Sequence, residues 1–196
     1  VSTLKAFGRK HWHKIAVMRS LTTIPFPEHM ARMASNVSKS TVRIKPLTWD
    51  SPFPRKEKGE VYFPLRKGTT VPDEVRDSNL PSILARESKI ILYFHGGAMC
   101  LCSPQSHREV ILRLSKLSNA IVIAPNYRKP PENPYPDPVD DCYEAYKKIR
   151  AANPQIKIIL AGDSAGGTLA LSVTKRALED RIQAPHSLAL FSPWVD

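Results

Sequence analysis

The chain has 196 residues, of which 42% are hydrophobic and 24% are charged, a composition typical of globular proteins rather than disordered, collagen-like or membrane-spanning chains. The formal net charge is +11, but residues 1–50 carry +7 of it (nine basic minus two acidic residues), and no nucleic-acid-binding motif accompanies the charge, so nucleic acid is not an expected partner. The three cysteines, Cys100, Cys102 and Cys142, lack disulfide or metal-ligand spacing, which predicts no metal site and favours a reducing compartment.

The N-terminal segment has the pattern of a basic amphipathic helix. Apolar residues fall near helical spacing between Leu4 and Met18, with lysine and arginine between them. Such a helix packs on the rest of the protein or lies on an anionic membrane surface, and both interpretations stay open. We expect residues 1–45 to form an N-terminal helical cap segment and residues 46–196 to form the first part of an α/β core. We also expect an intracellular protein, cytoplasmic or membrane-associated.

The core region alternates between strand and helix patterns. Two short strands are predicted first, at residues 41–49 and 60–65, and the polar residues 66–88 are predicted to be loop. Nearly continuous apolar runs, typical of parallel strands buried on both faces, follow at residues 90–94, 120–124, 156–161 and 187–191. Helical patterns lie between them at residues 106–117, 138–152 and 165–180. The alternation predicts an α/β fold with an open, doubly wound, mostly parallel sheet.

One motif joins the third apolar run to the helix that follows it. Gly162-Asp163-Ser164-Ala165-Gly166, extended by Gly167, is G-x-S-x-G between a predicted strand and a predicted helix. A serine on such a turn holds its hydroxyl above the sheet, and the flanking glycines let the backbone turn without a Cβ clash. The motif favours Ser164 as a nucleophile, with Gly162, Asp163, Gly166 and Gly167 shaping the turn. The alternative is a glycine-rich turn whose serine only caps the helix.

A second motif, His95-Gly96-Gly97-Ala98, directly follows the first apolar run. This is where an HGGG-type loop supplies backbone donors to an oxyanion, and glycines there let N–H groups approach a carbonyl oxygen closely. We expect His95 to shape the loop, because a catalytic base at this position would have the wrong order along the chain. The two motifs are 69 residues apart (164 − 95).

Together the motifs resemble those of the hormone-sensitive-lipase family of α/β-hydrolases. Asn126-Tyr127-Arg128-Lys129-Pro130-Pro131-Glu132, followed by Pro134-Tyr135-Pro136, is similar to the family's D-Y-R-L-A-P-E-x-x-F-P-A segment, and residues 192–196 are similar to its segment after the next strand. The resemblance covers about residues 85–196. It implies the α/β-hydrolase fold and an oxyanion hole of Gly96, Gly97, Ala98 and Ala165, in which Gly96 forms the turn and the other three donate. Ala98, Asn126 and Lys129 depart from the family pattern.

The resemblance implies serine-dependent hydrolysis of a carboxylic ester, with an acyl or lipid-like ester as the small-molecule substrate and no metal or organic cofactor. In this fold the triad acid and base follow the nucleophile in the chain. The only histidine after Ser164 is His186, which we expect at the opposite edge of the sheet. We therefore expect a chain truncated after the strand that follows the nucleophile helix, and inactive by itself. The alternatives are a hydrolase-like small-molecule binding protein without the base, and an acyltransferase.

Overall fold

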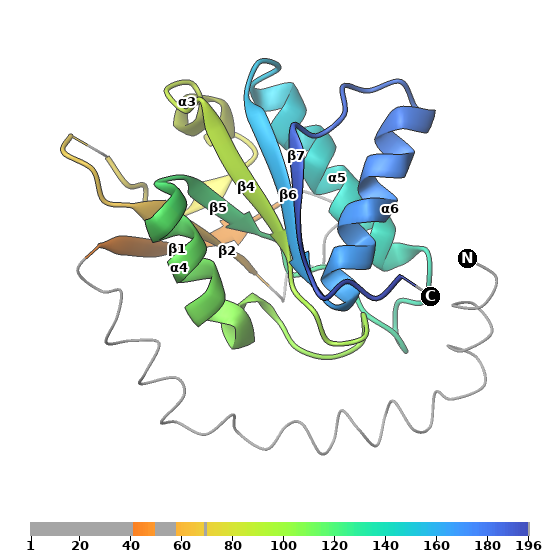
Figure 1. Cartoon of the computed structure of the whole chain (residues 1–196). Coiled ribbons are helices and arrows are strands. Elements are labelled where there is room, and N and C mark those ends of the chain that lie inside the picture. The colour runs from red at the N-terminus through yellow and green to blue at the C-terminus, as the bar shows by residue number, and fades with distance from the viewer. Residues whose placement is uncertain (1–40, 50–57, 69, 196) are drawn as a thin grey trace.

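The computed structural model describes residues 41–49, 58–68 and 70–195. These residues form a seven-stranded sheet with helices packed on it (Figure 1). The predicted basic helix, its capping role and its contact with a membrane fall on residues 1–40, outside the described residues, and stay predictions. The predicted boundary after residue 45 lies inside the first described strand, β1 (Val42–Thr48).

The sheet is mostly parallel, as predicted. Its other strands are β2 (Gly59–Pro64), β3 (Val75–Arg76), β4 (Lys89–Phe94), β5 (Ile121–Ala124), β6 (Lys157–Asp163) and β7 (Ser187–Phe191). The strand order is β3-β1-β2-β5-β4-β6-β7. Strands β5, β4, β6 and β7 are parallel to one another, whereas β2 runs antiparallel to both β1 and β5.

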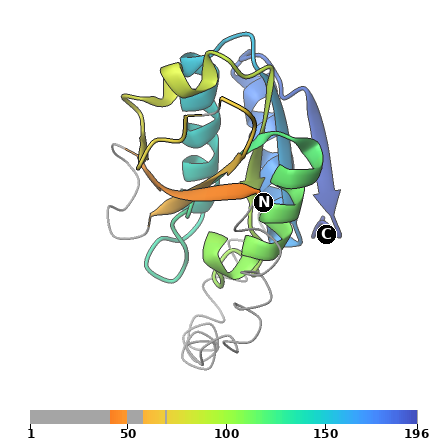
Figure 2. The same ribbon diagram turned by 90° about the vertical axis from the view of Figure 1, so that its left-hand side faces the viewer.

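Helices cover both faces of this sheet, which confirms the doubly wound arrangement. The helices are α3 (Leu80–Leu84), α4 (Arg108–Ser118), α5 (Asp137–Ala152) and α6 (Ala165–Glu179), and the short 3-10 helix η1 (Pro104–His107) precedes α4. Ile111 and Leu112 of α4 belong to one apolar core cluster, and residues of α3, α5 and α6 belong to the other. Figure 2 shows α4 and α5 on opposite sides of the strands.

The prediction of loop for residues 66–88 is wrong in part, because this segment contains β3 and α3. Pro81 favours a loop interpretation, but it lies in the first turn of α3, where the missing N–H costs no helical hydrogen bond. Leu80 and Leu84 of α3 are buried in the core, so tertiary packing stabilises a helix too short to show a pattern. The other strands and helices predicted within the described residues agree with the structure to within two residues at each end.

The parallel pairing of β4 with β6 places the two sequence motifs side by side. Phe94, the last residue of β4, lies level with Gly162 in β6, so the chain enters both motifs at the same carboxyl edge of the sheet. Ligands bind at this edge in open α/β sheets. The His186 N–H donates to the Ile158 carbonyl at 2.7 Å, which places His186 at the amino ends of the strands. The expectation that His186 lies at the opposite edge is confirmed.

A buried ion pair fixes the segment after β5 onto α5. The Asp141 side chain is fully buried and accepts from the Arg128 backbone N–H at 2.7 Å and from its guanidinium at 2.7 and 2.9 Å. Arg128 also lies 3.3 Å from Asp137. Both the backbone and the side chain of Arg128 therefore depend on one carboxylate.

We predict that Asp141→Ala lowers the free energy of unfolding by about 3 kcal/mol, because removing one partner of a buried ion pair leaves the other charge poorly compensated. The control is Asp73→Ala, since Asp73 is fully exposed and pairs only with Lys45 across the surface; it should leave stability unchanged. Urea unfolding of both variants measures the difference. Equal midpoints for the two variants would show that Asp141 contributes no more than a surface charge.

Candidate active site

Ser164 lies alone between the end of β6 and the start of α6, with its side chain exposed. Its backbone is left-handed, with φ 50° and ψ −120°, a conformation that costs a non-glycine residue about 1–2 kcal/mol. Backbone hydrogen bonds hold it there. The Ser164 N–H donates to the Phe191 carbonyl at 3.0 Å, and the Ser164 carbonyl accepts from Trp194 at 3.1 Å and Gly167 at 3.0 Å. The segment after β7 therefore fixes the serine turn.

Glycine is required at three positions of this turn, because neighbouring atoms lie too close to leave room for a Cβ. A Cβ at Gly166 would lie 2.0 Å from the Phe94 carbonyl oxygen, and one at Gly162 would lie 2.4 Å from the backbone of Gly166. A Cβ at Gly167 would lie 2.7 Å from the Pro193 side chain. Side chains at these positions would push the first turn of α6 away from β4 and from the segment after β7.

Ser164 directly precedes Ala165, the first residue of α6. Ala165, the first helical residue, is fully buried, and the first N–H groups of a helix have no partner within the helix. The aligned peptide dipoles add a partial positive charge at this end. Within the described residues, the Ser164 hydroxyl makes no hydrogen bond. The turn thus presents a hydroxyl beside a group of backbone donors.

The neighbouring loop, residues 95–98, also has an unusual backbone. Gly97 has a φ of 106° and Ala98 a φ of 52°, so Ala98 occupies a left-handed conformation that glycine would adopt without strain. The Gly97 carbonyl accepts from the N–H groups of Cys100 at 3.0 Å and Leu101 at 2.8 Å. These bonds turn the loop back toward η1.

His95 supports this loop from inside the protein. Its ring stacks on the Tyr127 ring with 4.3 Å between centroids, and its Nδ1 lies 2.7 Å from the Gly96 carbonyl, which makes Nδ1 the protonated nitrogen. Burial, together with the charge of Lys129, lowers the pKa of His95 to about 3. The Tyr127 hydroxyl donates to the His95 carbonyl at 2.8 Å. His95 is therefore a neutral ring packed beneath the loop.

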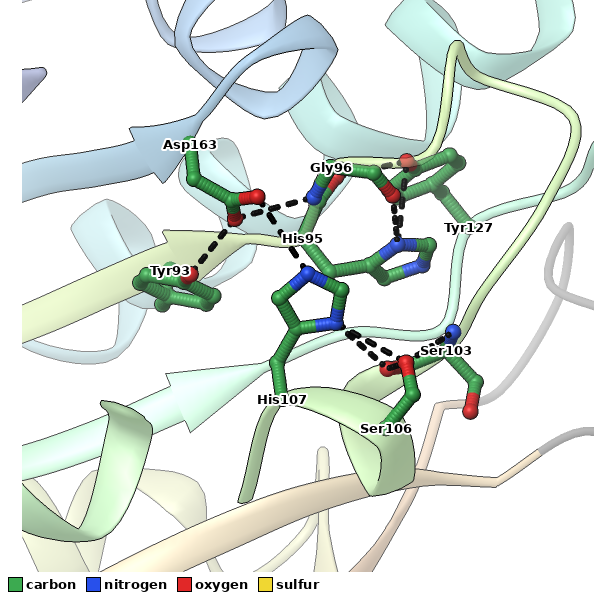
Figure 3. Close-up of polar contacts among 8 residues, drawn as sticks. All are labelled: Tyr93, His95, Gly96, Ser103, Ser106, His107, Tyr127 and Asp163. Atoms are coloured by element: carbon green, nitrogen blue, oxygen red, sulfur yellow. Dashed lines mark hydrogen bonds and ion pairs between the residues drawn. The ribbon is translucent and has the colours of Figure 1, made fainter. Parts of the chain in front are cut away.

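Asp163 connects the serine turn to this loop (Figure 3). Its Oδ1 accepts from the Gly96 N–H at 2.9 Å and from the Tyr93 hydroxyl at 2.6 Å, and its Oδ2 lies 3.2 Å from His107 Nε2. Burial alone would raise the pKa of Asp163, but the hydrogen bonds from His107 and Tyr93 outweigh it and lower the pKa to about 2. Because a Cβ at Gly96 would lie 2.2 Å from Oδ2, only glycine permits this contact.

The structure places both motifs at the same carboxyl edge of the sheet and joins them through the Asp163–Gly96 hydrogen bond. It adds contacts of Tyr93, His107 and Tyr127 that sequence reasoning did not predict. Tyr93 lies in β4 one position before the last residue of the strand, Phe94, so the strand register offered a signal for it. His107 has no such signal, because its contact with Asp163 spans 56 positions and depends on how η1 packs.

In the described part of the chain no cluster of three or more His, Cys, Asp or Glu side chains could hold a metal ion. No helix there is long and apolar enough to cross a membrane.

Known proteins share this sequence pattern. An acetyl-hydrolase of Streptomyces hygroscopicus is 38% identical over 112 residues, covering 57% of this chain and 38% of that protein. The carboxylesterase/phospholipase LipF of Mycobacterium tuberculosis is 34% identical over 186 residues, covering 85% of this chain and 48% of LipF. The chain spans less than half the length of these two relatives.

The crystal structure of EstE7, a hormone-sensitive-lipase homologue from a metagenome library, matches with a TM-score of 0.64 at 29% identity, covering all of this chain and 56% of EstE7. A family model described as alpha/beta hydrolase fold matches residues 91–196, a segment that contains both motifs and their supporting residues. The chain therefore belongs to the alpha/beta hydrolase fold family and to its hormone-sensitive-lipase-like group.

Proposed function

We propose that this chain supplies the nucleophile and the oxyanion-binding half of a serine-dependent carboxylic-ester hydrolase. The observation that carries the proposal is the exposed Ser164 hydroxyl on a left-handed turn between β6 and α6, beside a loop whose backbone is bonded to the same turn through Asp163. The names of the relatives, carboxylesterase/phospholipase among them, support an acyl or lipid-like ester as the substrate.

The proposed chemistry depends on which backbone N–H groups remain available to bind the oxyanion. Ser164 Oγ attacks the acyl carbon and the carbonyl oxygen becomes negative; the C–O bond to the alcohol then breaks, and water later releases the acyl group. Gly96 already donates its N–H to Asp163, so it forms the turn and does not bind the oxyanion. We assign the oxyanion to the N–H groups of Gly97, Ala98 and Ala165. One such donor typically contributes a factor of about 10² to 10³ in rate.

The described histidines do not serve Ser164 as a base. His95 is buried and bonded to Gly96, His107 is bonded to Asp163, and His186 lies at the amino ends of the strands. A serine hydroxyl is a weak nucleophile until a neighbouring base removes its proton. We therefore propose that a base outside the described residues completes the site. We also propose that the 196-residue chain is a slow catalyst by itself, because the base follows the nucleophile along the chain in this fold.

The first test is covalent labelling. We expect a fluorophosphonate probe to modify Ser164 when free imidazole supplies the base, because the probe's phosphoryl oxygen would take the place of the oxyanion. Peptide mass spectrometry should locate the adduct on Ser164, and Ser164→Ala should abolish it. Ser172→Ala is the matched control, since Ser172 lies within α6 and bonds to the Thr168 carbonyl. An adduct that survives Ser164→Ala would show that the nucleophile lies elsewhere.

The second test supplies the missing base. A site without its base should retain only about 10³- to 10⁴-fold acceleration over water, so p-nitrophenyl butyrate turnover by the 196-residue chain should be slow. Free imidazole should raise the Ser164-dependent part of the rate, measured as the difference from Ser164→Ala at each imidazole concentration. Fast turnover without imidazole would mean that the chain contains its own base. Tight binding of an ester without any acylation would favour the hydrolase-like binding protein instead.

The third test concerns the left-handed Ala98. We predict that Ala98→Gly raises the free energy of unfolding by about 1 kcal/mol, because glycine adopts this φ without the steric cost that Cβ imposes. The substitution keeps the N–H, so imidazole-assisted hydrolysis should not fall. Denaturant unfolding and p-nitrophenyl butyrate kinetics measure the two effects. A loss of stability together with a loss of rate would show that Cβ of Ala98 is needed to align the loop.

A further inference from the structure

His107, which neither motif contains, joins the end of η1 to the first turn of α4. Its side chain is 17% exposed, and its Nε2 lies 3.2 Å from Asp163 Oδ2. The ring lies 5.7 Å from the His95 ring, centroid to centroid, and Figure 3 shows it pointing from η1 toward the Asp163 carboxylate. His107 thus brings η1, besides β4 and β6, into contact with Asp163, whose hydrogen bond to Gly96 connects the two loops.

The surroundings of His107 provide acceptors for both ring nitrogens. Nε2 faces the ionised carboxylate of Asp163, which can only accept. Nδ1 lies 2.9 Å from Ser106 Oγ and 3.2 Å from the Ser103 carbonyl oxygen. Ser106 Oγ is itself 2.7 Å from that carbonyl oxygen, and a hydroxyl proton placed between these two oxygens leaves Nδ1 as the donor to Ser106. A proton on each ring nitrogen satisfies all of these contacts.

We propose that His107 is a positioning residue of the oxyanion loop: as an imidazolium it holds the Asp163 carboxylate, which in turn holds the Gly96 N–H and orients the donors that follow. The proposal rests on the oxyanion function assigned above to Gly97 and Ala98. Without His107 one oxygen of Asp163 loses its partner, and the carboxylate can rotate away from Gly96. The loop would then lose a bond at the residue directly before its first donor.

The charges around His107 favour its protonated form. Asp163 at the end of β6 is the facing anion, and Tyr93 of β4 shares that carboxylate. His95 is neutral. The Lys129 ammonium lies over the Tyr127 ring, and Arg108, next to His107 in the chain, is paired with Glu60 of β2. Burial alone lowers the pKa of His107, but the hydrogen bond and charge of Asp163 outweigh burial and raise the pKa above its ordinary value of 6.5.

The sign of the pH effect follows from linkage. Because the folded-state pKa of His107 lies above the unfolded value, its stabilisation is fully present below about pH 6.5 and is lost as the pH rises through the folded-state pKa. The connection between His107 and the loop should therefore weaken on the alkaline side. Asp163, with a pKa of about 2, stays ionised throughout this range.

The test is NMR titration of the 196-residue chain labelled with ¹⁵N in glycine and histidine. We expect both His107 nitrogens to carry protons below pH 6.5, and the Gly96 amide resonance to shift with the same midpoint as His107. His107→Gln keeps an N–H toward Asp163 but cannot titrate, so the Gly96 shift should lose its pH dependence. His186→Gln is the matched control and should leave the titration unchanged. A Gly96 titration that persists in His107→Gln would overturn the proposal.

Two further readouts separate positioning from general stability. In His107→Phe, which has no donor, hydrogen exchange at the Gly96 amide should accelerate at least about 10-fold, while exchange at Ile91 inside β4 stays unchanged. In His107→Gln both exchange rates should stay near the parent values. In imidazole-assisted hydrolysis His107→Phe should lower kcat about 10-fold or more with little change in KM, since a misplacement of about 1 Å can cost about 10² in rate, and His107→Gln should largely restore it.

The outcomes distinguish the two proposals. If the parent chain shows no Ser164-dependent hydrolysis, the proposed function fails, while the Gly96 titration still decides whether His107 acts through Asp163. If Gly96 titrates with His107 but His107→Phe hydrolyses esters at the parent rate, the contact exists and the positioning role is wrong.

Discussion

The Asp163 carboxylate is the group on which both halves of the site depend. It belongs to the serine turn by sequence, yet its hydrogen bonds go to Gly96, Tyr93 and His107. A half-buried carboxylate would be costly without partners, and three donors offset that cost. The same donors orient the carboxylate. Asp163 therefore also fixes the distance between the nucleophile turn and the oxyanion loop.

This arrangement requires that two loops distant in the sequence emerge side by side. Parallel pairing of β4 with β6, with Phe94 level with Gly162, provides the adjacency. Glycine then permits the approach, because a Cβ at Gly96 would strike Asp163 and one at Gly166 would strike the backbone at Phe94. The glycines therefore allow the two loops to contact each other, in addition to allowing the turns in which they occur.

Sequence reasoning could predict most of the fold because buried parallel strands and amphipathic helices leave strong local patterns. It failed at α3, where Pro81 occupies a helical first turn and burial of two leucines decides the outcome. It located Ser164 and the loop at residues 95–98 because each is a contiguous motif. It could not find His107, since that contact depends on the packing of η1 against the end of β6 rather than on any spacing along the chain.

Two histidines 5.7 Å apart are driven to opposite protonation states by their neighbours. His95 is fully buried among a carbonyl, an aromatic ring and the nearby charge of Lys129, so its neutral form is favoured. His107 faces a carboxylate and keeps some solvent contact, so its cation is favoured. A histidine acting as base for Ser164 must be neutral, which requires a pH above its own pKa. The positioning cation requires a pH below the pKa of His107. In the proposed mechanism the rate of a completed site would fall on the acid side as the base is protonated, and on the alkaline side as His107 loses its proton. The raised pKa of His107 moves the second decline toward alkaline pH.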